Sequence, residues 1–445
     1  MSKMTLESKR FVGSIAARGE IVPLVFDVSA GEDGRLAIEP LPLDVQNALT
    51  LQTSMGEPGS YLESLCLKGD AEDGSTFFSD TTELHGIRQG MRECSISLRA
   101  RQATIEINFD PPVKPPLMRL WFRGFKSFRN APVLMSLGTV QVVGPNKLSS
   151  QDEMAGYVAI QAPEGVIASD WLNKADKFLT FMHRGLAFAH GGRLQTPRLD
   201  ELVESRWKAT FYDGEGYPKS LAPIHFLNQE PFIKALVARF EESSPFPDML
   251  WTAVGWLHSF NSFDEVRYLV SMTALETVIE HVIPKKQTTV ISKPAFAPIR
   301  DRLLTALEGD DLAGAARDIF VGRLKGLNSR TLSQKMQALR DHYGLPADVF
   351  SDEAITGITK ARNNIVHTGA SKESQDLFQK EIFIREFITR IVFHEVGYNG
   401  PYESYVNGYR SIHSQAAGKS PEFQDDTNHS TAGSVEVNQA TDRRF

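Results

Sequence analysis

The chain has 445 residues, of which 41% are apolar and 23% charged, and its formal net charge at pH 7 is −7. These values are typical of a globular protein with two or three domains, and they exclude collagen-like, fully disordered and membrane-spanning chains. The acidic balance argues against a general nucleic-acid coat protein. Two cysteines, and an amino terminus (MSKMTLESKR) without an apolar segment, lead us to expect the reducing cytoplasm.

Residues 1–165 are predicted to form a β-rich domain with a sandwich or barrel-like fold. Six segments are short and rich in Val, Ile, Phe and Thr: 10–17, 23–30, 34–42, 94–110, 117–125 and 138–144. Ile105, Ile107 and Phe109 alternate with polar residues, which is the period of a half-buried strand. Clusters of Gly, Pro, Asn and Asp, such as DPPVKPP at 110–116, predict turns between the strands. Nothing in this region indicates catalysis.

Residues 166–227 are predicted to be a mixed connecting region. Ser169 and Asp170 are the expected N-cap of a helix from Trp171 to His190. The two glycines after His190 are expected to end that helix. Two segments that follow are predicted to be strands.

Residues 228–400 are predicted to form an all-α bundle, because apolar residues now recur three and four positions apart. Eight amphipathic helices are expected, at 231–240, 248–260, 263–283, 299–308, 315–327, 332–344, 352–367 and 375–396. Their short connections favour a bundle. Residues 414–445 lose apolar content, and we expect a disordered tail there. The predicted fold class is therefore α+β.

A basic stretch runs from Lys285 to Arg340. It holds eleven Lys or Arg and five Asp or Glu, so its net charge is +6. A basic stretch in an acidic protein is compatible with a phosphate-binding face. The alternative is the solvated side of several helices.

Most familiar catalytic motifs are missing from the sequence. It contains no phosphate-binding loop of the GxxxxGK[ST] type, no GxGxxG after a strand, no HExxH and no GxSxG. No cluster of Cys and His has the spacing of a metal site, so we expect neither a metal nor a cofactor.

One polar run, KARNNIVHTG at 360–369, interrupts the end of an otherwise amphipathic helix. Asn363 and His367 are four residues apart and share one helix face, toward which the long side chain of Arg362 can bend. Ile365 and Val366 between them are expected to be buried. Arginine binds phosphate oxygens, and histidine moves protons near neutral pH, so the trio suits phosphodiester chemistry without a metal. The alternative is a polar helix end whose histidine favours the helix dipole.

Other residues that could carry chemistry have simpler interpretations. Glu276 and His281 are predicted to lie on a helix surface or at the core edge. His183 and His190 are predicted to pack within an apolar helix. Trp251 and Trp256 are predicted to be core residues.

The run RNNIVH at 362–367 resembles the Arg-x4–6-His motif of HEPN-domain ribonucleases, in which Asn commonly follows Arg. TALETVIEHVI at 273–283 resembles the Leu-Glu helix of that family. A β-rich amino-terminal domain before the bundle is similar to the arrangement of ApeA-like HEPN proteins, which belong to bacterial anti-phage defence. The resemblance covers about residues 230–400.

This resemblance implies an endoribonuclease that cleaves single-stranded or loop RNA without a metal, with the RNA 2′-hydroxyl as nucleophile. His367 would be the acid/base, Arg362 would hold the scissile phosphate, and Asn363 would orient one of them. Two motifs usually meet across a homodimer, which implies a composite site, and a phage-derived trigger is a further expected partner. Two alternatives stay open: an inactive HEPN module that dimerises or binds RNA, and a ligand-binding protein dominated by the β-rich domain.

Overall fold

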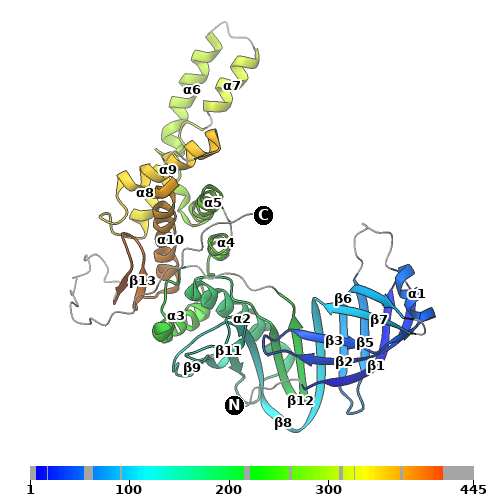
Figure 1. Ribbon diagram of the computed structural model, residues 1–445. Helices are drawn as coiled ribbons and strands as arrows, with labels where there is room; N and C mark the ends of the chain where they lie inside the picture. The colour runs from blue at the N-terminus through cyan, green and yellow to red at the C-terminus, as the bar shows by residue number, and fades with distance from the viewer. Residues whose placement is uncertain are drawn as a thin grey trace.

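The computed structural model describes residues 7–17, 19–54, 64–90, 93–214, 221–259, 263–309, 314–324, 326–370 and 374–413. A barrel-like, β-rich part is followed by a helical part, so the predicted α+β class is confirmed (Figure 1). The predicted tail at 414–445 lies outside the described residues. None of the helices in the described ranges has both the length and the apolar character needed to cross a lipid bilayer.

A twelve-stranded antiparallel sheet forms the β-rich part. Its strands are β1 (Lys9–Ala17), β2 (Glu20–Ala30), β3 (Leu36–Pro40), β4 (Leu43–Asp44), β5 (Leu65–Asp70), β6 (Thr76–Gln89), β7 (Glu93–Ala100), β8 (Gln102–Arg123), β9 (Val133–Met135), β10 (Gly138–Val143), β11 (Met154–Gln161) and β12 (Arg198–Tyr212). The order is β4-β7-β3-β2-β1-β5-β6-β8-β11-β10-β9, with β12 paired to β8. Because β6 also pairs with β7, the strands β7-β3-β2-β1-β5-β6 close into a ring.

The barrel has a core of its own, built from alternating apolar side chains. Phe11, Phe26 and Phe77 are fully or almost fully buried, and their ring centroids lie 5.2–5.7 Å apart. Such burial stabilises the fold by about 1.5–3 kcal/mol for each phenylalanine. A short helix, α1 (Val45–Ser54), contributes Leu51 to the same core.

The turn predicted at 110–116 is wrong, because this proline-rich segment lies inside the long strand β8. Here β8 pairs irregularly with β12, and the register shifts on both sides of Glu204. On its other edge, β6 pairs with β8 only at residues 104–106, and β11 pairs with it only from Leu117 onward. Proline removes a hydrogen-bond donor, which a strand tolerates at such an edge or bulge.

A buried ionic cluster joins β8 to β12 between the barrel and the helical part. The fully buried carboxylate of Asp200 accepts hydrogen bonds from Arg198 Nε (2.6 Å), Arg119 Nη2 (2.7 Å), Trp121 Nε1 (2.7 Å) and Trp207 Nε1 (3.0 Å). Burial by itself would raise the pKa of Asp200, but the two guanidinium groups outweigh it and lower that pKa. Four side chains thus satisfy the buried charge, as an interior carboxylate requires.

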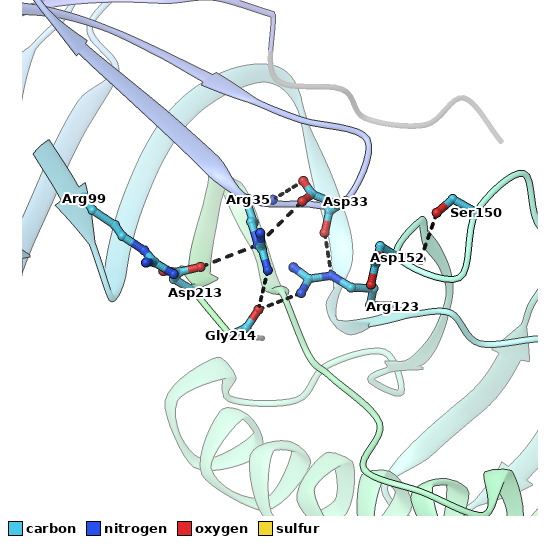
Figure 2. A network of polar contacts seen from close by, with 8 residues as sticks. All are labelled: Asp33, Arg35, Arg99, Arg123, Ser150, Asp152, Asp213 and Gly214. Carbon is cyan, nitrogen blue, oxygen red and sulfur yellow. Dashed lines mark hydrogen bonds and ion pairs between the residues drawn. The ribbon is translucent and has the colours of Figure 1, made fainter. Parts of the chain in front are cut away.

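A second polar network fastens the loop between β2 and β3 to the ends of β8 and β12 (Figure 2). Arg123 donates from Nε to the Asp33 carbonyl (3.0 Å) and from Nη1 to the Gly214 carbonyl (2.8 Å). Arg35 donates to the same Gly214 carbonyl (3.2 Å), and its Nε lies 3.7 Å from the Asp213 carboxylate. These arginines are bound to groups of the chain itself, which indicates a structural joint.

The helices of the rest of the chain lie close to their predicted positions. They are α2 (Ala168–His190), α3 (Gln229–Glu241), α4 (Asp248–Leu257), α5 (Asp264–Val282), α6 (Lys293–Gly309), α7 (Gly314–Leu324), α8 (Leu332–His342), α9 (Asp352–Thr368) and α10 (Ser374–Val396), followed by a hairpin of β13 (Tyr402–Ser404) and β14 (Arg410–Ile412). The predicted end of α2 is confirmed, since Gly191 caps it with φ 77°. The predicted N-cap is wrong: Ser169 and Asp170 lie inside the first turn, and Ile167 precedes the helix.

One continuous core connects the helical part to β8, β10 and β11. Leu186 of α2, Leu236 of α3, Leu275 of α5 and Ile388 of α10 are fully buried in it. Trp251 is buried as predicted. The core position predicted for Trp256 is wrong, since 44% of that residue is exposed.

Helices α6 and α7 project from the bundle on the side away from the barrel (Figure 1). Neither helix contains a buried residue. Much of the basic stretch Lys285–Arg340 lies on this projection and at its base.

Candidate active site

The predicted motif occupies the last two turns of α9. Ser351 caps this helix by accepting a hydrogen bond from the Ala354 amide (3.2 Å), and Gly369 ends it with φ 76°. Ile365 is buried and anchors the motif to the core. Val366 is 53% exposed, so its predicted burial is wrong. Successive helical residues point about 100° apart, so two neighbours rarely face the same core.

Helix α5 holds α9 in place. The buried Tyr268 of α5 donates a hydrogen bond to the Ile358 carbonyl of α9 (2.7 Å), and burial raises the pKa of this tyrosine. Ile358 and Ile355 of α9 are buried in the same core. These contacts set the rotation of α9 about its axis, and so they decide which way the motif side chains point.

Arg362 points from α9 toward α5. Its Nε lies 3.3 Å from Oε1 of Glu276, and its Nη1 donates a long hydrogen bond to Oδ1 of Asn363 (3.4 Å). The side chains of Arg362 and Glu276 are 34% and 36% exposed. An ion pair so accessible to water is weak, at about 0–1 kcal/mol. An incoming anion can therefore displace Glu276 from the guanidinium.

Arg362 and Asn363 line a surface cleft of about 320 Å³ between α5, α8 and α9. Its other lining residues are Glu276 and Glu280 of α5, Thr359 of α9, and Thr331, Leu332, Ser333 and Lys335 at the start of α8. Lys335 is ion-paired with Glu280, so two carboxylates and two cations face each other across this cleft. The amino-terminal end of α8, whose dipole favours anions, also lies on the cleft.

His367 is exposed in the last turn of α9 and is not among the residues that line the cleft. The reason is helix geometry, because residues five apart point about 140° away from each other. The structure thus brings Arg362 and Asn363 together, and it places His367 on the neighbouring open face of the same helix end. Within one copy of the chain, the arginine and the histidine do not converge.

Glu276 is the residue whose part in this site the sequence interpretation missed. The sequence predicts for it a place on a helix surface or at the core edge, and in the structure it contacts the motif arginine directly. Its place in TALETVIEHVI, the segment that resembles the Leu-Glu helix, was the available signal. His281, on the same helix, is exposed and contacts the Thr277 carbonyl through Nδ1 (2.9 Å).

The other candidate histidines, His183 and His190, pack against aromatic rings as predicted. His183 stacks on Phe122 with ring centroids 6.0 Å apart, and its Nε2 lies 2.6 Å from the Leu194 carbonyl. Burial lowers the pKa of His183, which favours the neutral ring. Among the described residues, no group of three or more His, Cys, Asp or Glu side chains has an arrangement that could hold a metal ion.

Comparisons of the chain with protein-family models, with curated proteins and with solved structures found no significant match.

Proposed function

We propose that this protein is an endoribonuclease of the HEPN type that acts in bacterial anti-phage defence, with the β-rich domain as sensor or regulator. The observation that supports this proposal is the pairing of Arg362 and Asn363 on an open cleft, with His367 exposed at the same helix end. A guanidinium that is one third exposed and held by a weak ion pair is available to a phosphate.

The reaction needs no group beyond these side chains and the RNA. His367 takes the proton of a ribose 2′-hydroxyl, whose oxygen attacks the adjacent phosphorus. The new O2′–P bond forms as the P–O5′ bond breaks, and the 5′-oxygen leaves with the proton that the histidine has taken up. Arg362 neutralises the charge that develops on the phosphate oxygens, and Asn363 orients its guanidinium. The products are a 2′,3′-cyclic phosphate and a 5′-hydroxyl.

The separation of Arg362 from His367 favours a composite site between two copies. Because the two side chains point about 140° apart on one helix, a phosphate bound in the cleft needs a histidine from elsewhere. A two-fold axis close to the end of α9 would bring the partner's histidine to the cleft, and symmetry would make two such sites.

The test is an RNA-cleavage assay in EDTA with mixed transfer RNA and a single-stranded RNA as substrates. We expect cleavage by the wild type, and a loss of at least about 100-fold in His367→Ala and in Arg362→Ala. His281→Ala, an exposed histidine on α5, serves as the matched control and should keep full activity. If His281→Ala and His367→Ala cleave equally, the assignment of His367 is wrong.

A second function is favoured by the charge balance of the cleft. Glu276 and Glu280 neutralise its two cations, as expected of a module that binds RNA or dimerises without cutting. RNA binding by a folded wild type, with no cleavage and with phage protection that is indifferent to His367→Ala, would establish this alternative.

A further inference from the structure

The projecting arm, defined as α6 and α7 (residues 293–309 and 314–324), stands on a rigid stem. Thr289 and Ser329 form an antiparallel bridge at its base, and the Val290 amide donates to the Asn328 carbonyl (2.9 Å). The buried side chain of Asn328 completes the stem, since it accepts from the Ile291 amide (3.0 Å) and donates to the Ile291 carbonyl (2.9 Å). The stem therefore holds the arm at a set position on the bundle.

The arm itself leaves its apolar side chains in solvent. Ile299 and Leu303 of α6 lie one turn apart and are 38% and 37% exposed, while Ile319 and Phe320 of α7 are 57% and 44% exposed. None of the arm residues in the described ranges belongs to either of the two large cores. Such a concentration of exposed Ile, Leu and Phe is typical of an interaction surface.

These two helices also need a partner for their stability. Helices of 17 and 11 residues are marginal by themselves, because helices in proteins depend on packing of an apolar face. In the described chain α6 packs mainly on α7. Two such pairs, placed face to face, form a four-helix bundle with a buried apolar centre.

The size of the arm suits a symmetric contact. Helix α6, with 17 residues, is about 25 Å long, and α7, with 11 residues, is about 16 Å long. At a width of about 10 Å for each helix, they make a face of roughly 400 Å² per copy. Two copies would bury about 800 Å² between the arms, and the contact proposed at the end of α9 would add to this area.

The charges of the arm favour a protein partner over RNA. The described arm carries Lys293 and four arginines against Asp301, Glu308 and Asp318, so its net charge is +2. Arg300 pairs with Asp301 (2.8 Å), Arg317 pairs with Glu308 (3.5 Å), and Arg302 donates to a backbone carbonyl of α6. A net charge of only +2 attracts a polyanion weakly, whereas mixed charges around an apolar face suit an isologous contact.

We infer that the arm is a dimerisation element that pairs with the arm of a second copy of this chain. The inference deepens the proposed function and rests on its need for a homodimer, and it names the surface that joins the two copies. The arm leaves the bundle between α5 and α8, the two helices that form the cleft with α9, so pairing of arms links two candidate sites.

Sedimentation velocity of the full chain at micromolar concentration tests this inference. The variant Leu303→Glu with Phe320→Glu should raise the dimer dissociation constant by at least about 100-fold, because each buried carboxylate occurs twice in a symmetric interface. Leu134→Glu, at an 80% exposed position of β9, is the matched control and should leave the dimer intact. Circular dichroism verifies that each variant is folded.

If the charged variant does not fold, a second variant tests the same inference. Residues 293–324 are replaced by a short Gly-Ser linker between the two sides of the stem, and a folded monomer is the expected product. A monomeric wild type would overturn the inference, as would a dimer that survives both variants. Loss of RNA binding with an unchanged dimer would also overturn it and would assign the arm to RNA.

These outcomes are separable from the proposed function. If the arm variants are monomeric and the wild type cleaves no RNA, the inference about the arm stands and the proposed nuclease activity is refuted. If cleavage depends on His367 and the dimer survives both arm variants, the proposed nuclease activity stands and the inference about the arm is refuted.

Discussion

Arg362 and Glu276 form an ion pair that crosses from α9 to α5, with Nε and Oε1 3.3 Å apart. The carboxylate occupies the place where a substrate phosphate would approach the guanidinium. It holds the arginine on the cleft in the free protein, and it competes with the anion that the arginine is proposed to bind.

Glu276→Gln is therefore expected to strengthen RNA binding. Removing one negative charge a few Å from a bound phosphate should improve the binding free energy by about 1 kcal/mol at a site open to water. This corresponds to about fivefold in affinity, and added salt should reduce the gain. The unfolding free energy should change by less than about 1 kcal/mol. Fluorescence anisotropy with single-stranded RNA in a His367→Ala background measures the affinity. Glu230→Gln, which removes a surface pair with Lys234, is the control, and weaker binding by Glu276→Gln would contradict the expectation.

Asp200→Asn is expected to destabilise the junction between barrel and bundle. The substitution leaves the buried guanidinium of Arg198 and the nearly buried one of Arg119 without their carboxylate, which costs about 3–5 kcal/mol of unfolding free energy. Urea unfolding measures the loss. Glu106→Gln breaks an exposed pair with Arg206 (3.7 Å) and should change stability by less than about 0.5 kcal/mol. Equal stability of the two variants would show that the buried cluster contributes nothing.

His258 is expected to make the fold sensitive to acid. Burial lowers the pKa of His258 to about 3, helped by the charges of Arg385, His190 and Arg193. The unfolded chain then takes up a proton below about pH 6.5 and the folded chain does not, so stability falls as the pH drops. The loss is about 1.4 kcal/mol per pH unit between pH 6.5 and 3.

The measurement is urea unfolding of the wild type and His258→Gln at about pH 7 and pH 5. The variant should lose less stability than the wild type over this interval, by about 2 kcal/mol. His281→Gln changes an exposed histidine and should follow the wild type. Identical pH profiles for the wild type and His258→Gln would refute the role of this histidine.

Two helical glycines are expected to respond in opposite ways to alanine. A Cβ atom at Gly185 of α2 would lie 2.5 Å from Leu236 Cδ1 of α3, so Gly185→Ala should destabilise the fold by about 1–3 kcal/mol. A Cβ atom at Gly357 of α9 meets open space, so Gly357→Ala should stabilise it by about 0.5–1 kcal/mol. Thermal unfolding compares the two, and a stabilising Gly185→Ala would show that α2 and α3 are less closely packed.

Local patterns predicted the elements well, because periodicity is a property of neighbouring residues. The period of three to four predicted α3 to α10, and the glycine after His190 ends α2 as expected, because Gly191 adopts the left-handed conformation. The same reasoning failed at 110–116, where proline indicated a turn. Whether a proline breaks a strand depends on whether a neighbouring strand requires the hydrogen bond that its missing amide would donate. That neighbouring strand is remote in sequence.

The candidate site was predicted in part. The run at 362–367 was placed correctly on a helix end, and Asn363 and His367 are exposed as a polar face requires. Arg362 is expected to bend toward the face that Asn363 and His367 share, and it does contact Asn363. Its Nε, however, pairs with Glu276, which lies 86 positions earlier in the chain. A pattern of neighbouring residues gives no information about a partner so far away in the sequence.

The α+β order, the extent of the helices and the polar end of α9 follow from local sequence, since each depends on residues within a few turns of one another. The tertiary structure decided which face of each helix met solvent. It buried Ile365 and exposed Val366 and Trp256, and it left the arm without a core. Packing joins segments distant in sequence, so the partners of Arg362 and Asp200 are set by the whole fold.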